Sequence, residues 1–270
     1  MAKKTVRARQ AKPQSAVDQL KPIFLFPFKD REATNRFIIG CALMLGGFVV
    51  PIIPALIAYG YALRILRSSA EGEPPSMPEW DDWGSLLSLG FRGGVVGFVL
   101  SLPSFVVFTI GMAAYFGTFL LIPLTSGSDS GEGGFVVLFL LAMGVLFLSM
   151  ALGFLLLLVA GVLLPGSVSH LVAQDKLGAA FRVQEWWSIL WANRLGYFIG
   201  LVVVAGIFGI SYWVFIVLYS TLILLCLAFL VIPPIGYYGM LVAAALFGEI
   251  YREGTEALQQ ATPPRGGARR

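Results

Sequence analysis

Pro78-Glu79-Trp80-Asp81-Asp82-Trp83-Gly84 is the densest cluster of charge and aromatic rings in a chain that is otherwise apolar. A second Trp-rich segment, Glu185-Trp186-Trp187 through Trp191, occupies a matching place later in the sequence. Long hydrophobic blocks flank both of them. We therefore expect both segments to lie at the border of an apolar environment.

The composition identifies that environment as lipid. Of the 270 residues 57% are hydrophobic and only 13% are charged, with a mean hydropathy of +0.82. A soluble domain carries about 25% charged residues, so one water-exposed core cannot hide this much apolar surface. We expect a single membrane domain over residues 31–254, between disordered cytoplasmic tails at 1–30 and 255–270.

The first tail is strongly basic. Nine of the nineteen Lys and Arg lie in the first 36 residues, where Asp18, Asp30 and Glu32 are the only acids. Such a tail is typical of an arm that contacts anionic lipid headgroups, and we expect no nucleic-acid partner. Because no apolar run follows the first bases, we expect no cleaved signal peptide.

Five apolar blocks are long enough to be considered as membrane helices, which need about 20 apolar residues. They cover residues 37–66, 91–123, 135–164, 196–232 and 233–252. Closely spaced prolines remove backbone donors and bend or end a helix. Pro233-Pro234 separates the last two blocks, and Pro51 with Pro54 interrupts the first. The first block is therefore either one kinked span or two helices, at about 31–50 and 54–69.

The distribution of Lys and Arg decides between these readings, because cytoplasmic loops carry an excess of both. One kinked span would place nine bases inside and ten outside, whereas two helices place all nineteen inside. Thr125–Gly134 and both proline turns then face outside. The sequence thus predicts an all-α polytopic bundle of about six transmembrane helices in three hairpins, in the plasma membrane, with both termini cytoplasmic.

Glycines are frequent within these blocks. Small residues let helix backbones approach closely in lipid. We therefore expect helix contacts at Gly40, Gly46, Gly47, Gly93, Gly94, Gly97, Gly111 and Gly117.

The segment around Trp80 has the features of a short amphipathic interface helix. Pro78 suits a first helical turn, and the acids suit the positive end of a helix dipole. Trp80, Trp83 and Leu87 then fall on one face. The second Trp segment reads likewise, with Leu177, Phe181 and Trp187 or Trp191 toward the membrane and Lys176, Arg182 and Glu185 away from it.

Two roles remain open for these helices. They either anchor the bundle at the inner membrane surface or form a docking patch for a protein partner. We expect the acids to pair with Arg64 and Arg67, or with Arg92 or Arg194. The candidate interface residues are Arg64, Arg67, Glu79, Trp80, Asp81, Asp82, Trp83, Trp186 and Trp187.

The helix Tyr59-Gly60-Tyr61-Ala62-Leu63-Arg64-Ile65-Leu66-Arg67, followed by an acidic spacer, residues 78–84 and Gly90, resembles a known family. That family is the uncharacterised multi-pass membrane family termed domain of unknown function 4013. The resemblance would cover about residues 37–253 and implies a polytopic membrane architecture. It implies no activity, substrate or functional residue.

Catalytic chemistry has no support in the sequence, and we expect a protein that is not an enzyme and holds no cofactor or metal. His170 has no Cys, Asp or Glu at ligand or triad spacing, which predicts a lone solvated or interface histidine. Cys41 and Cys226 lie in apolar runs and read as small buried hydrophobes. Two functions remain: a membrane module that docks partners through a cytoplasmic Trp/acid face, or a small uncoupled permease or lipid-handling component.

Overall fold

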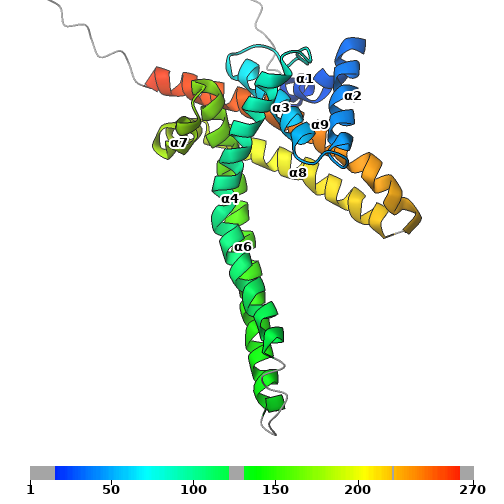
Figure 1. The fold of residues 1–270 in the computed structure, drawn as a ribbon. Helices are drawn as coiled ribbons and strands as arrows, with labels where there is room; N and C mark the ends of the chain where they lie inside the picture. Colours follow the sequence, from blue (N-terminus) through cyan, green and yellow to red (C-terminus); the bar gives the residue numbers. More distant parts are fainter. Residues whose placement is uncertain (1–15, 122–130, 221, 262–270) are drawn as a thin grey trace, which may run out of the picture.

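The computed structural model describes residues 16–121, 131–220 and 222–261, and the regular elements in this part of the chain are all helices. Two pairs of long helices project as separate arms from a helical body (Figure 1). The first arm pairs α4 (Trp83–Leu120) with α6 (Gly131–Gln174). The second arm pairs α8 (Arg194–Tyr219) with α9 (Leu222–Ala261).

These four helices are long and apolar enough to cross a membrane. They contain 38, 44, 26 and 40 residues. At 1.5 Å per residue they span about 57, 66, 39 and 60 Å, against about 30 Å for the hydrocarbon core of a bilayer. The shorter helices α2 (Arg31–Gly46) and α3 (Ile53–Ala70) are not among the candidates found in the described residues. The expected six spans are therefore not confirmed.

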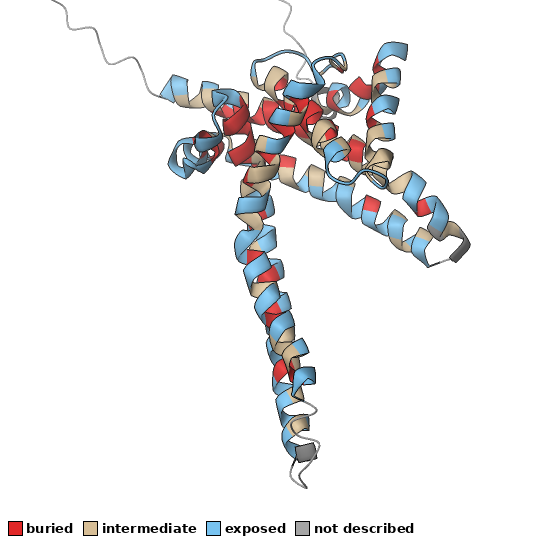
Figure 2. Ribbon diagram, viewed as in Figure 1, coloured by how far each residue is buried: buried red, intermediate tan, exposed pale blue. Residues whose placement is uncertain are grey.

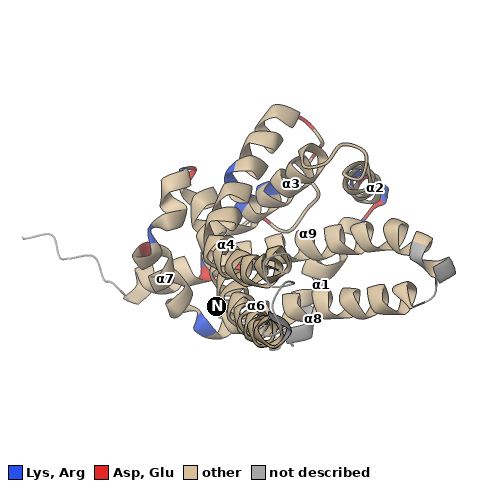
Figure 3. Cartoon of the chain, turned by 60° about the horizontal axis from the view of Figure 1, so that its bottom comes forward, with Lys and Arg blue, Asp and Glu red and all other residues tan. Residues whose placement is uncertain are grey.

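Apolar surface and charge occupy different parts of the molecule. Buried residues concentrate in the body, whereas most residues along the arms are exposed (Figure 2). The exposed positions on the arms are large and apolar, such as Phe98, Leu148 and Ile210. Lys, Arg, Asp and Glu gather in the body and leave the arms uncharged over most of their length (Figure 3). This separation suits a protein whose arms lie in lipid.

The prolines act differently at their two sites. Pro51 and Pro54 do separate two helices, α2 and α3, with Ile52 between them at a φ of 78°. The predicted break at Pro233-Pro234 is wrong, because both prolines lie inside α9. The chain instead turns just after Tyr219, before α9 begins at Leu222. Each proline removes one backbone donor, which leaves one carbonyl of the helix without its partner. If the chain ended the helix here within lipid, more backbone groups than these two would lose their hydrogen bonds.

Part of the expected disordered tail is folded. Residues 16–28 form α1 (Ala16–Leu25) and the short 3-10 helix η1 (Phe26–Phe28). Ile23 and Phe26 are each only 3% exposed, and the Tyr238 hydroxyl on α9 donates to the Phe24 carbonyl at 3.0 Å. At the other end α9 runs to Ala261, beyond the expected boundary at residue 254. Residues 1–15, 122–130 and 262–270 lie outside the described residues, so the predictions for them stay predictions.

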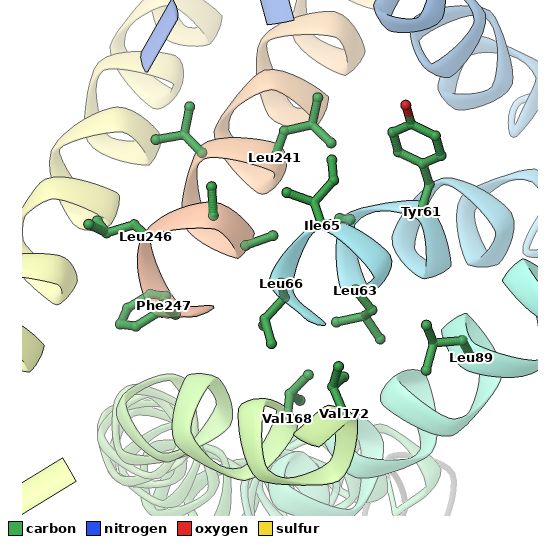
Figure 4. Packing of buried hydrophobic residues seen from close by; sticks show 14 of the residues in the cluster. Tyr61, Leu63, Ile65, Leu66, Leu89, Val168, Val172, Leu241, Leu246 and Phe247 are labelled. Carbon is green, nitrogen blue, oxygen red and sulfur yellow. The ribbon is translucent and has the colours of Figure 1, made fainter. Parts of the chain in front are cut away.

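Helix α3 is the centre of the body. Its side chains Leu63, Ile65 and Leu66 are almost fully buried. They meet residues of α4, α6 and α9, among them Leu89, Val168, Val172 and Leu241 (Figure 4). Burial of this kind stabilises the fold by about 25 cal/mol for each Å² of apolar surface removed from solvent.

Glycine allows the closest helix crossings. A Cβ on Gly60 of α3 would overlap the Leu86 carbonyl of α4, and one on Gly90 would overlap the Leu56 carbonyl. Contacts at Gly40, Gly93 and Gly111 confirm part of the expected set, whereas Gly46 and Gly117 face open space. The Gly60–Gly90 crossing was not among the predicted contacts.

Candidate functional site

Residues 78–84, hereafter the Trp/acid segment, do not form the separate amphipathic helix that was predicted. The backbone from Glu73 to Pro78 has no regular secondary structure, and helix begins only at Trp83, as the first turn of α4. Pro74, Pro75 and Pro78 disfavour helical backbone in the residues before them. Asp82 is the cap of α4, with its Oδ1 accepting from the Ser85 amide at 3.3 Å. A capping aspartate of this kind commonly sets a helix start.

Trp80 fastens the Trp/acid segment to the body. Its ring stacks on Tyr61 of α3 with centroids 3.9 Å apart, and on Trp83 at 5.5 Å. Its Nε1 donates to the Arg36 carbonyl of α2 at 2.8 Å. In return the Tyr61 hydroxyl donates to the Pro78 carbonyl at 2.6 Å. The segment is thereby held against α2 and α3.

Two arginines complete this attachment. Arg64 pairs with Asp81, as predicted, and donates to Ser85 Oγ at 3.2 Å. This guanidinium hydrogen-bonds the Asp81 carboxylate and lowers its pKa. Arg36 pairs with Glu79 at 3.2 Å and donates to the Met77 carbonyl at 2.5 Å. The role of Arg36 was not predicted, because it lies on α2, 43 residues before Glu79.

Arg67 does not reach the Trp/acid segment. Arg67 of α3 and Arg92 of α4 instead share Asp175, at 3.0 and 3.1 Å. Asp175 follows the last residue of α6 and has a φ of 50°. One carboxylate therefore joins α3, α4 and the end of α6.

The Trp/acid segment turns its anchors inward and its charges outward. Trp80 is half-buried, whereas Glu79, Asp81, Asp82 and Trp83 are exposed. The result is a small acidic surface on a backbone that is held in place by stacking and hydrogen bonds.

The second Trp segment is a short helix, as predicted, but its indoles divide between two environments. Helix α7 (Val183–Ala192) follows the 3-10 helix η2 (Leu177–Phe181). Trp186 is 1% exposed, donates to the Ala180 carbonyl at 3.0 Å and packs over Gly166. Trp187 and Trp191 are exposed and stack on each other at 6.1 Å. Trp186 is thus a core residue, and Trp187 belongs to an outward aromatic face.

The prediction of a lone histidine, solvated or at the interface, is wrong in that His170 is neither alone nor solvated. His170 lies on α6 and is 3% exposed. Its Nε2 lies 3.1 Å from Glu185 Oε2 on α7, and its Nδ1 lies 2.7 Å from the Tyr251 hydroxyl on α9. A neutral imidazole with its proton on Nε2 satisfies both bonds, since it donates to the carboxylate and accepts from the phenol. The hydrogen bond from His170 lowers the pKa of Glu185, which Arg182 also contacts at 3.4 Å.

The His170 cluster joins three helices of the body. Its buried ring bonds Glu185 of α7 through Nε2 and Tyr251 of α9 through Nδ1, so the side chain links α6 to both of them. Within the described residues, no group of His, Cys, Asp and Glu is arranged to hold a metal ion. Cys41 and Cys226 are free thiols, the first half-buried and the second exposed.

Comparison with known proteins gives one family. No curated protein and no solved structure matches the chain. The sequence profile of a family described as "Protein of unknown function (DUF4013)" matches residues 43–220. The match is narrower than the predicted 37–253, but it contains α3, the Trp/acid segment, His170 and α7. Since it covers more than half of the chain, the protein belongs to the DUF4013 family.

Proposed function

We propose that this protein is a multi-pass plasma-membrane protein whose two arms cross the bilayer from a cytoplasmic body. The observation that supports it is the separation of apolar arms from a charged body (Figure 3). Four crossings place all nineteen Lys and Arg on one side, as six crossings do. The charge count therefore argues for an even number of spans and for both termini on the cytoplasmic side. The basic residues before α1 would then face anionic headgroups.

We further propose that α2 and α3 enter the membrane beside α9 without crossing it. Phe48, Val49 and Ile52, in the turn between them, are strongly exposed and apolar. Phe48 packs edge-to-face on Phe229 of α9 at 5.6 Å. Phe229 lies seven residues, or about 10 Å, inside the far end of α9. Backbone amides 47, 48, 49, 50 and 53 donate to backbone carbonyls, which satisfies most of the donors of this turn, as a lipid environment favours.

The body, in this proposal, is a non-catalytic module that docks a protein partner through the Trp/acid segment. What supports docking is the exposure of Glu79, Asp81 and Asp82 on a backbone that is already fixed. A preorganised surface loses less conformational entropy on binding than a flexible one. Glu79 and Asp81 each pair with one arginine of the body, and the exposed carboxylate of Asp82, beside the indole of Trp83, has no ion pair among the described residues. This surface suits a partner that presents Lys or Arg.

The competing permease reading is not favoured by the helix geometry. It relied on helices broken by proline that could line a path for a substrate. Pro103, Pro233 and Pro234 instead lie within helices that continue through them. Of the proline sites on which that reading relied, Pro51 with Pro54 marks a break between two described helices, α2 and α3.

Co-purification from native membranes tests the docking proposal. The variant Glu79→Gln with Asp82→Asn removes two charges and keeps a capping residue at 82. The matched control is Glu71→Gln with Glu73→Gln, since both are exposed acids in the preceding spacer. We expect one or more proteins that crosslink to the wild type and to the control to be lost from the first variant, at unchanged melting temperature. Equal recovery with all three proteins would overturn docking at this surface.

A further inference from the structure

A small apolar cavity lies where the two arms meet the body. It has a volume of about 160 Å³ and is lined by Val162 of α6, Trp187 and Trp191 of α7, and Arg194 and Phe198 of α8. Arg194 is the first residue of α8, so the cavity combines apolar walls with one guanidinium.

Arg194 has no carboxylate partner among the described residues. Six of the other seven arginines there form ion pairs: Arg36, Arg64, Arg67, Arg92, Arg182 and Arg252. The guanidinium of Arg194 instead lies 5.9 Å from the ring centroid of Trp191. The carboxylate of Glu253 is held at 2.8 Å by Asn193 and borders a different cavity, with Leu20 and Ile23. The positive charge of Arg194 is therefore available to a ligand.

The surroundings of Arg194 are those of a membrane interface. Leu195 and Phe198, which follow it on α8, are 69% and 62% exposed, as a lipid-facing surface requires. Trp191, just before it, is 60% exposed. Tryptophan and a basic residue at the start of a spanning helix are typical of headgroup depth.

We propose that this cavity binds one anionic phospholipid from the cytoplasmic leaflet. The lipid phosphate contacts Arg194 beside Trp191, because guanidinium groups bind phosphate oxygens in paired hydrogen bonds. The glycerol end enters the cavity, and the acyl chains follow the exposed apolar surface of α6 and α8. A net negative lipid is preferred over a zwitterionic one, whose own ammonium competes for the phosphate. The inference rests on the proposal that the arms lie in a membrane.

Native mass spectrometry of the purified full chain in detergent tests the site without depending on membrane topology. Phosphatidylglycerol and phosphatidylcholine with the same acyl chains are titrated against the wild type, Arg194→Gln and Arg31→Gln. Arg31 is the matched control, since it is also exposed and without an ion pair among the described residues. We expect the first phosphatidylglycerol to bind the wild type and Arg31→Gln roughly tenfold more tightly than Arg194→Gln, as for loss of a charge-assisted hydrogen bond.

Two further measurements belong to the same experiment. Arg194→Lys keeps the charge and is expected to recover part of the affinity, which guards against a variant that fails to fold. Inorganic phosphate in excess is expected to leave the bound lipid in place. Equal binding of the two lipids by the wild type, or equal loss in Arg31→Gln, would overturn the proposal. Displacement by inorganic phosphate would show a simple anion site instead.

Discussion

Tyr61 and Trp80 lie face to face, with ring centroids 3.9 Å apart and ring planes 13° from parallel. Each side chain also donates a hydrogen bond to a backbone carbonyl. The Tyr61 hydroxyl donates to Pro78, and Trp80 Nε1 donates to Arg36. This stack, more than the charges beside it, holds the Trp/acid segment to the body. Aromatic stacking adds to the area that such rings bury.

Replacing Trp80 should therefore destabilise the protein clearly. We expect Trp80→Ala to lower the free energy of unfolding by roughly 3 kcal/mol, the range for losing a well-packed Trp side chain. Trp83→Ala is the control, since Trp83 sits at the end of the same stack and is 44% exposed, and it should cost much less. Thermal unfolding in detergent measures both. Equal losses in the two variants would show that the stack does not hold the segment.

Asp175 should matter through its two arginine partners. Asp175→Asn keeps a residue that tolerates the φ of 50° and removes only the charge. Exposed ion pairs contribute about 0–1 kcal/mol each, so we expect a small loss of stability at low salt. The difference from wild type should shrink in about 1 M salt, where charges are screened beyond about 3 Å. A loss that is independent of salt would mean that Asp175 acts through geometry and not through charge.

Glu185 should make stability depend on pH in the acid range. The pKa of Glu185 is lowered in the folded protein, chiefly by the hydrogen bond from His170. The stability that the Glu185 carboxylate contributes is therefore present above the ordinary pKa of about 4.3 and is lost as pH falls below that value. Glu185→Gln should thus be less stable than wild type at pH 7 and approach it as pH falls through the lowered pKa of Glu185. Unfolding followed across this range measures the difference. A gap that persists unchanged at low pH would contradict the His170–Glu185 link.

The depth of the α2–α3 turn can be measured with a single cysteine at Val49 in a chain that lacks Cys41 and Cys226. We expect it to resist an impermeant maleimide from either side and to react once detergent replaces the lipid, because the turn stays within the apolar layer, where a thiol remains protonated. Val49 is 84% exposed, so protein packing would not block the reaction. Labelling by the impermeant reagent from outside would instead establish α2 and α3 as two further spans.

Local chemistry predicted some of these features well. The Asp81–Arg64 pair was predictable because Arg64 lies near the end of α3 and only a short spacer separates this helix from Asp81. The break at Pro51 and Pro54 and the helix of the second Trp segment follow from the same kind of reasoning.

Other features depend on packing between distant helices, which sequence spacing does not reveal. His170 meets Tyr251, 81 residues away, only because α6 and α9 pack in the same body. Arg36 meets Glu79 because α2 returns to the start of α4. The break predicted at Pro233 and Pro234 was wrong because the cost of a proline within a helix must be compared with the cost of ending the helix there. In lipid, ending the helix would leave more backbone groups without hydrogen bonds.

Impermeant labelling of cysteines at Ser220 and Ser188, one at a time in the chain without Cys41 and Cys226, tests the central claim most directly. Ser220 lies at the far end of the α8/α9 arm, and Ser188 lies on α7 in the body; both are exposed. If the arms cross the membrane from a cytoplasmic body, Ser220→Cys is labelled from outside intact cells and Ser188→Cys only after the membrane is opened. Labelling of both from the same side would show that the α8/α9 arm does not cross, and would contradict the account.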